Sequence, residues 1–186
     1  MEANEPKKEQ NTEEMDVMKQ FMELLGQQGM KEQSQDFMEV LQYIAGMQLQ
    51  LSAMVDELQG VRKQLERMQE SQPKAAESQL LDKVSYLQEK VSSLAERLSE
   101  LKDHLIDTAA QAVTAFKEKG REEMNRVLQK GISGVQSVLS GCREKMVDVL
   151  TSYEKTANQI DSIGDEFKQI GNSVANVGRL LTGKGT

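Results

Sequence analysis

Tryptophan is absent from this chain of 186 residues, and aromatic side chains of all kinds make up only 4% of it. Large aromatics commonly fill the cores of globular enzymes, so their scarcity argues against a compact mixed fold. Proline occurs only at Pro6 and Pro73. Because a proline inside a helix costs roughly 3 kcal/mol, such long proline-free stretches suit long helices.

Residues that commonly carry out chemistry are also scarce. The single cysteine, Cys142, cannot form an internal disulfide, which fits a reducing compartment, and we expect it to be a buried, inert thiol. The single histidine, His104, lacks a second histidine for a metal site, and we expect it at the surface. Residues 178–184 have the spacing of a phosphate-binding loop, but Gly185 stands where that motif needs Ser or Thr. We therefore expect no enzymatic activity, no cofactor and no metal site.

Charge and hydropathy predict a soluble cytoplasmic protein. The formal net charge is -7. Residues 1–119 hold 14 Lys/Arg and 22 Asp/Glu, a balance of -8, whereas residues 120–186 hold 9 and 8, a balance of +1. An acidic body makes non-specific binding of nucleic acid unfavourable, because such binding needs a basic stripe. The N-terminal segment shows no apolar region of a secretory signal, and no apolar run approaches the roughly 20 residues that a membrane-spanning helix needs.

What the chain does contain is a seven-residue apolar repeat in three blocks, and such a repeat predicts long helices that pack along other long helices. The first block, over residues 31–70, has ten apolar seam positions: Phe37, Val40, Ile44, Met47, Leu51, Met54, Leu58, Val61, Leu65 and Met68. The second block, over residues 79–119, has eight: Leu80, Val84, Leu87, Val91, Leu94, Leu98, Leu101 and Leu105. The third block, over about 121–181, has sixteen seam positions, of which only Thr156 is polar.

We predict an all-α fold: an extended, coiled-coil-like bundle of long helices. Gly131, Gly134 and Gly141 predict a weak point in the third block, since each glycine costs about 1 kcal/mol relative to alanine. The expected segments are a disordered tail over 1–12, a helical hairpin over 13–70 whose first helix covers 13–28, a linker over 71–78, helices over 79–119 and 120–182, and a tail over 183–186. Two geometries remain open, because the blocks can fold back into an antiparallel bundle or pair between chains as an oligomer.

The candidate interaction face is the second seam, from Leu80 to Leu105, together with three glycines placed seven residues apart: Gly164, Gly171 and Gly178. Small residues at this spacing allow another helix to approach closely, although packing against a helix of the same chain explains them better.

Three functions are compatible with this sequence. The leading hypothesis is a non-enzymatic interaction or scaffold protein, which binds a protein partner or a second copy of itself through a helical face. The second is contact with a membrane surface through segment 109–142, which has apolar residues on one face and basic residues on the other. The third, a regulator of a DNA-transfer machinery, is implied only by the family resemblance given below, and the acidic body disfavours it.

Three stretches also resemble a known family: residues 21–47 (FMELLGQQGMKEQSQDFMEVLQYIAGM), 112–120 (AVTAFKEKG) and 170–184 (IGNSVANVGRLLTGK). In sequence and in order, these stretches resemble those of an uncharacterised bacterial family, a domain of unknown function encoded on conjugative and integrative elements of gut bacteria. The resemblance covers most of the chain from about residue 15. It implies an accessory protein of a mobile element, and it implies no activity, cofactor or site residue.

Overall fold

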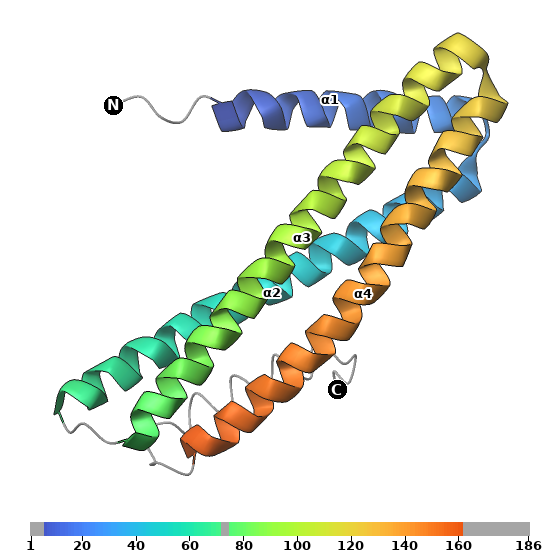
Figure 1. Cartoon of the computed structure of the whole chain (residues 1–186). Helices are drawn as coiled ribbons and strands as arrows, with labels where there is room; N and C mark the ends of the chain where they lie inside the picture. Colours follow the sequence, from blue (N-terminus) through green and yellow to red (C-terminus); the bar gives the residue numbers. More distant parts are fainter. Residues whose placement is uncertain (1–5, 72–74, 162–186) are drawn as a thin grey trace. The chain divides into compact units, whose positions relative to one another are not determined.

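The structure, a computed structural model, describes the backbone of residues 6–71 and 75–161 and the side chains of residues 12–70 and 78–159. This part of the chain is all-α, as predicted. It consists of the helices α1 (Pro6–Gln27), α2 (Lys31–Ser71), α3 (Ala75–Lys119) and α4 (Arg121–Asp161), shown in Figure 1. The three long helices correspond to the three apolar repeats.

Two glycines with positive φ end helices. Gly29 has φ 66°, and its N–H donates to the carbonyl of Gly26 at 3.2 Å, while the N–H of Met30 donates to the carbonyl of Leu25 at 3.0 Å. This pair of hydrogen bonds is the Schellman motif, and the buried side chains of Met30 and Leu25 match its usual hydrophobic contact. Gly120, with φ 88°, separates α3 from α4 in the same left-handed region.

Two helix boundaries differ from the prediction. Helix α1 begins at Pro6 rather than at residue 13, inside the segment expected to be a tail. Proline is favoured in the first turn of a helix, where its missing N–H costs nothing, so Pro6 is suited to this start. Helix α3 begins at Ala75, inside the expected linker of 71–78. Alanine is the strongest helix former, and Ala75 and Ala76 extend α3 toward Pro73.

The glycines predicted to form a weak point do not break α4, which is continuous from Arg121 to Asp161. At Gly131 the missing side chain leaves room for Thr108 of α3, because a Cβ at this position would overlap the Thr108 side chain. Close helix packing at this position and the burial of Ile132 and Val135 outweigh the low helix propensity of glycine.

The helices form two compact units. Unit 1 contains Met1–Ala45 and Ser99–Ser140, and unit 2 contains Gly46–Leu98 and Gly141–Thr186. Helices α2, α3 and α4 therefore contribute to both units, whereas the sequence predicted consecutive segments.

Unit 1 has its core between α1, the first part of α2, the second part of α3 and the first part of α4. The rings of Phe21 in α1 and Phe37 in α2 lie 4.8 Å apart between centroids, tilted by 59°. Buried apolar side chains of α3 and α4 complete this core: Leu101, Leu105, Ala109, Ala112, Val113, Met124, Leu128, Ile132, Val135 and Leu139.

Unit 2 has its core between the second part of α2, the first part of α3 and the second part of α4. A hydrogen bond joins each pair of these helices: Arg62 Nη1 to Gln88 Oε1 at 3.4 Å, Tyr153 Oη to Glu57 Oε2 at 2.9 Å, and Lys83 Nζ to Gln159 Oε1 at 2.6 Å. Of the ten predicted seam positions of α2, nine are buried across the two units, and only Met68 is half-buried.

Candidate functional site

Unit 2 has a groove between α3 and α4, formed by two adjoining hollows of about 230 and about 440 Å³. Both hollows are lined by Tyr86, Leu87 and Ser152, so they are parts of one surface feature, which we name the α3/α4 groove. Its other lining residues are Asp82, Lys83, Lys90, Ser93, Leu94 and Arg97 from α3, and Cys142, Lys145, Asp148, Val149, Lys155, Thr156 and Gln159 from α4.

The floor of the groove is apolar and follows the helical repeat. Leu87 and Leu94 lie seven residues apart on α3, and Cys142 and Val149 lie seven residues apart on α4. All four side chains are buried. Two turns of helix separate the members of each pair, so the floor offers apolar contacts at the spacing that a helical ligand itself repeats.

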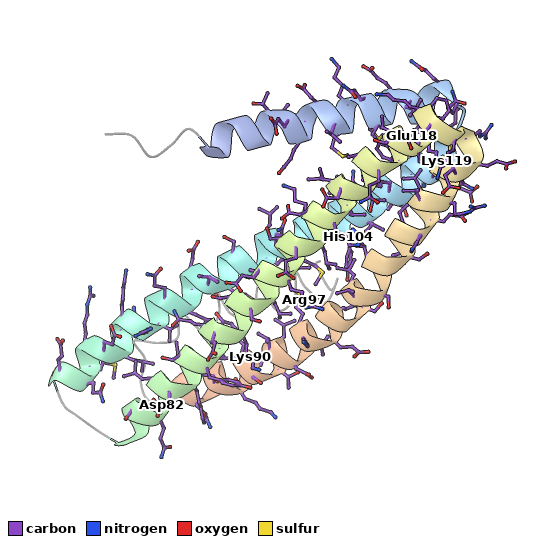
Figure 2. The ribbon with its side chains drawn as sticks, turned by 45° about the horizontal axis from the view of Figure 1, so that its top comes forward. Asp82, Lys90, Arg97, His104, Glu118 and Lys119 are labelled. Carbon is purple, nitrogen blue, oxygen red and sulfur yellow. The ribbon has the colours of Figure 1, made fainter. Side chains whose placement is uncertain are left out.

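The rim of the groove is basic. Lys83, Lys90 and Arg97 recur every seven residues along α3, and Lys145 and Lys155 lie on α4. Figure 2 shows Lys90 and Arg97 following one another along α3 beyond Asp82. The groove residues include five Lys or Arg and two Asp, a balance of +3, whereas the whole chain carries -7. Positive charge is therefore concentrated at this site.

None of these five cations has a carboxylate partner among the described residues, and Lys83 donates instead to Oε1 of Gln159. Among the described residues, no carboxylate oxygen lies within 4.0 Å of the charged nitrogens of Lys90, Arg97 or Lys145. The ammonium group of Lys90 lies 5.3 Å from the ring centroid of Tyr86, within range of a cation–π interaction, and the Tyr86 side chain is 56% exposed. The rim thus presents positive charge and an exposed aromatic side chain over an apolar floor.

Cys142 lies on this floor, with a side chain only 3% exposed. Burial raises the pKa of its thiol, and the nearby positive charges of Arg97 and Lys145 offset part of that effect. A buried thiol whose pKa is raised is a poor nucleophile, because the thiolate is the reactive form. Cys142 therefore packs as a small apolar side chain, as predicted.

The eight predicted seam residues of α3 are all buried inside the chain. Leu80, Val84, Leu87, Val91, Leu94 and Leu98 lie in unit 2, and Leu101 and Leu105 lie in unit 1. The helices of this chain therefore cover most of the seam, and Leu87 and Leu94 line the α3/α4 groove. Gly164, Gly171 and Gly178 lie outside the described residues.

The basic rim was not predicted from the sequence, because the prediction considered only the apolar positions of the repeat. The seven-residue spacing of Lys83, Lys90 and Arg97 was the available signal, since charges at this period flank a helical seam. The sequence did not reveal which helix lies beside α3, and therefore did not reveal that Lys145 and Lys155 face the same groove.

The two remaining sequence candidates are His104, which lies in unit 1, and segment 109–142, most of which lies in unit 1. His104 is exposed, as predicted, and its Nδ1 lies 3.5 Å from Oγ1 of Thr108. Segment 109–142 is not one amphipathic helix, because Gly120 divides it between α3 and α4. Its apolar side chains are largely buried, most of them within unit 1.

Two further features, a membrane-spanning helix and a metal site, are absent from the described residues. No described helix is both long and apolar enough to cross a membrane. Within the same residues, no group of three or more His, Cys, Asp or Glu side chains is arranged to hold a metal ion.

Comparison with known proteins gives a family and no function. A family of unknown function, DUF6674, matches residues 14–186. The chain has no significant match among curated proteins and none among solved structures. Since the match covers nearly the whole chain, including every residue of the α3/α4 groove, this protein belongs to the DUF6674 family.

Proposed function

We propose that this protein is a non-enzymatic interaction protein, which holds another protein in the α3/α4 groove of unit 2. The observation that carries the proposal is the groove itself: an apolar floor under a rim of cations that have no carboxylate partner among the described residues, in a chain whose overall charge is -7. A partner would bury the floor, and its negative charges would pair with the rim.

The chemistry of the groove supports binding rather than catalysis. Its side chains are mainly lysine, arginine, serine and aliphatic residues, and Cys142 is buried with a raised pKa. General acid–base catalysis needs a group that exchanges protons near neutral pH and lies against the reacting atom. Lysine and arginine ordinarily stay protonated at that pH, so they are suited to attract an anionic partner.

The likeness to proteins of conjugative and integrative elements supports a narrower proposal, that the protein is an accessory protein of such an element. An interaction protein of this kind would have its partner encoded close by. Sequencing the DNA on both sides of the gene tests this point: transfer or integration genes beside it agree with the proposal, and a setting among housekeeping genes contradicts it.

The interaction itself is tested by purifying the tagged protein from its native cells after crosslinking. The groove variant reverses three rim charges: Lys90→Glu, Arg97→Glu and Lys145→Glu. The control variant reverses three exposed cations outside the groove: Lys31→Glu, Lys63→Glu and Lys130→Glu. Both variants change the net charge equally.

We expect one partner protein to copurify in similar amounts with the wild type and with the control variant. We expect the groove variant to lose this partner. Circular dichroism and urea unfolding establish that both variants remain folded. A partner that is recovered equally with all three forms would contradict a binding site at the groove.

A further inference from the structure

We propose that the ligand of the α3/α4 groove is an acidic amphipathic α-helix of the partner, with large apolar side chains on one face and Asp or Glu on both sides of that face. This inference rests on the proposed function and specifies the chemistry of the partner. Three properties of the groove carry it: the period of its floor, its length and the placement of its charges.

The floor matches the period of a helix. Its apolar side chains recur every seven residues on both walls, at Leu87 and Leu94 and at Cys142 and Val149. Seven residues advance a helix by about 10.5 Å, so apolar residues of a bound helix, repeated at the same interval, would meet the floor twice. An extended strand advances about 3.3 Å per residue and alternates its faces, so it does not share this repeat.

The length of the groove suits a helix of about five turns. On α4 the lining residues extend from Cys142 to Gln159, and 17 steps of 1.5 Å correspond to about 26 Å. A helix of about 18 residues covers that distance. Helices this short are marginal in isolation, so the partner segment is expected to gain helix content when it binds.

The charges select an acidic helix. Lys83, Lys90 and Arg97 flank the floor along α3, while Lys145 and Lys155 flank it along α4, so cations lie on both sides of the apolar strip. These correspond to the positions beside a coiled-coil seam, where charges determine which partner pairs. Lys90, Arg97 and Lys145 have no carboxylate partner among the described residues. Acidic side chains at the flanking positions of a bound helix would provide such partners.

Tyr86 adds an anchor at the centre of the groove. It lines both hollows, its side chain is 56% exposed, and Lys90 lies over its ring. Tyrosine contributes large contact area with little loss of conformational freedom, which is why it is common in binding surfaces. A helix in the groove would cover this ring.

The test uses the full chain and three labelled peptides of about 18 residues, a length set by the rise per residue of a helix. The first has leucines at the seam positions and glutamates at the flanking positions. The second replaces these glutamates by lysines. The third has the composition of the first in an order that disperses the leucines around the helix. Fluorescence anisotropy measures binding, and circular dichroism measures the helix content of the peptide.

The first peptide is expected to bind about tenfold or more tightly than the other two, and to become helical on binding. In the variant with Lys90→Glu, Arg97→Glu and Lys145→Glu, the preference should shift to the lysine peptide. The variant that carries Lys31→Glu, Lys63→Glu and Lys130→Glu should behave like the wild type. Should charge reversal unfold the groove, Lys90→Gln, Arg97→Gln and Lys145→Gln provide a milder version that should only weaken the acidic peptide.

A second readout locates the peptide. Cys142 is the only cysteine of the chain and lies on the groove floor, so the bound acidic peptide should slow the reaction of its thiol with iodoacetamide. Unchanged labelling would overturn the assignment of the peptide to this groove.

Several outcomes would overturn the acidic helix. If the dispersed peptide binds as tightly as the first peptide, charge alone explains the binding and an apolar face is not needed. If the lysine peptide binds as tightly as the first peptide, the basic rim does not select the ligand. A dimer of the chain, dissociated by reversal of the rim charges in sedimentation experiments, would make a second copy the ligand. A crosslink from the rim to residues 162–186 would make the chain's own end the ligand. If the peptides fail while a protein is still captured through the groove in cells, the acidic helix is wrong and the proposed function stands.

Discussion

The hydroxyl of Tyr153 in α4 donates a hydrogen bond of 2.9 Å to Oε2 of Glu57 in α2. Tyr153 occupies a seam position of the third repeat and its side chain is 3% exposed, so its hydroxyl has little access to water. The carboxylate of Glu57 satisfies this buried donor and ties α4 to α2 inside unit 2.

Replacing Tyr153 by phenylalanine keeps the buried ring and removes the donor. We expect Tyr153→Phe to lower the free energy of unfolding by about 1 kcal/mol, the usual net contribution of one such hydrogen bond. Urea unfolding measures the change. Tyr43→Phe is the matched control, because Tyr43 is 45% exposed, and it should have almost no effect. Equal effects of the two substitutions would contradict the role of the Glu57 bond.

The same tyrosine predicts a pH dependence. Burial raises the pKa of the Tyr153 hydroxyl far above its ordinary value, and the charge of Glu57 and the hydrogen bond to it raise the pKa further. Above a pH of about 10, the unfolded chain loses this proton while the folded chain keeps it, so stability falls as pH rises, by up to about 1.4 kcal/mol per pH unit. Tyr153→Phe abolishes this contribution.

The stability difference between wild type and Tyr153→Phe should therefore be constant below pH 9 and should shrink or reverse between pH 10 and 11, since an unperturbed tyrosine titrates near pH 10. Urea midpoints measured in parallel across this range test the sign. A difference that stays constant or grows as pH rises would contradict a raised pKa of Tyr153 in the folded chain.

Replacing Gly131 or Gly134 of α4 by alanine is expected to change the stability of the protein in opposite directions. A Cβ at Gly131 would overlap the side chain of Thr108, whereas nothing lies within 4 Å of a Cβ at Gly134. Gly131→Ala should destabilise the protein by about 1–3 kcal/mol through overpacking, and Gly134→Ala should stabilise it by up to about 1 kcal/mol through helix propensity.

Thermal unfolding of the two variants checks this prediction. Adding Thr108→Ala to Gly131→Ala should recover part of the lost stability, because it removes the atoms that the new methyl group meets. Equal stabilisation by both glycine substitutions would mean that α3 and α4 are not in close contact at Gly131.

The thiol of Cys142 reports the electrostatics of the groove. The positive charge of Arg97 opposes the burial that raises the pKa of this thiol, so Arg97→Ala should raise the pKa further. The pH profile of alkylation by iodoacetamide should move to higher pH, and the rate at a fixed pH of 8 should fall. Lys63→Ala, which removes an exposed charge of α2, should leave the profile in place. A shift to lower pH in Arg97→Ala would contradict the placement of Arg97 beside the thiol.

Helix positions were predictable because apolar spacing and helix stops act locally. Val84 and Leu87 are buried as the repeat requires, and Gly29 ends a helix because it adopts a left-handed conformation without strain. The close approach of α3 to α4 at Gly131 was not predictable, because the contact is with Thr108, a residue far away in the sequence.

The groove was not predictable for a similar reason. A repeat shows which side of a helix is buried, but it does not say which helix covers it. Lys90 and Lys145 are 55 positions apart, and only the pairing of α3 with α4 brings them to the same rim. The seam from Leu80 to Leu105 looked like an interface because a narrow apolar stripe is equally suited to a partner chain or to the same chain.

The central claim, that the α3/α4 groove holds a protein partner, is tested most directly by a photo-crosslinking residue placed at Tyr86 or, as the control, at Tyr43. Both side chains are exposed, but only Tyr86 lies in the groove. Irradiation of cells should give one discrete crosslinked protein from Tyr86, weakened by Arg97→Glu with Lys145→Glu, and none from Tyr43. The same protein crosslinked from both positions, or a crosslink at Tyr86 that survives the charge reversal, would contradict the account.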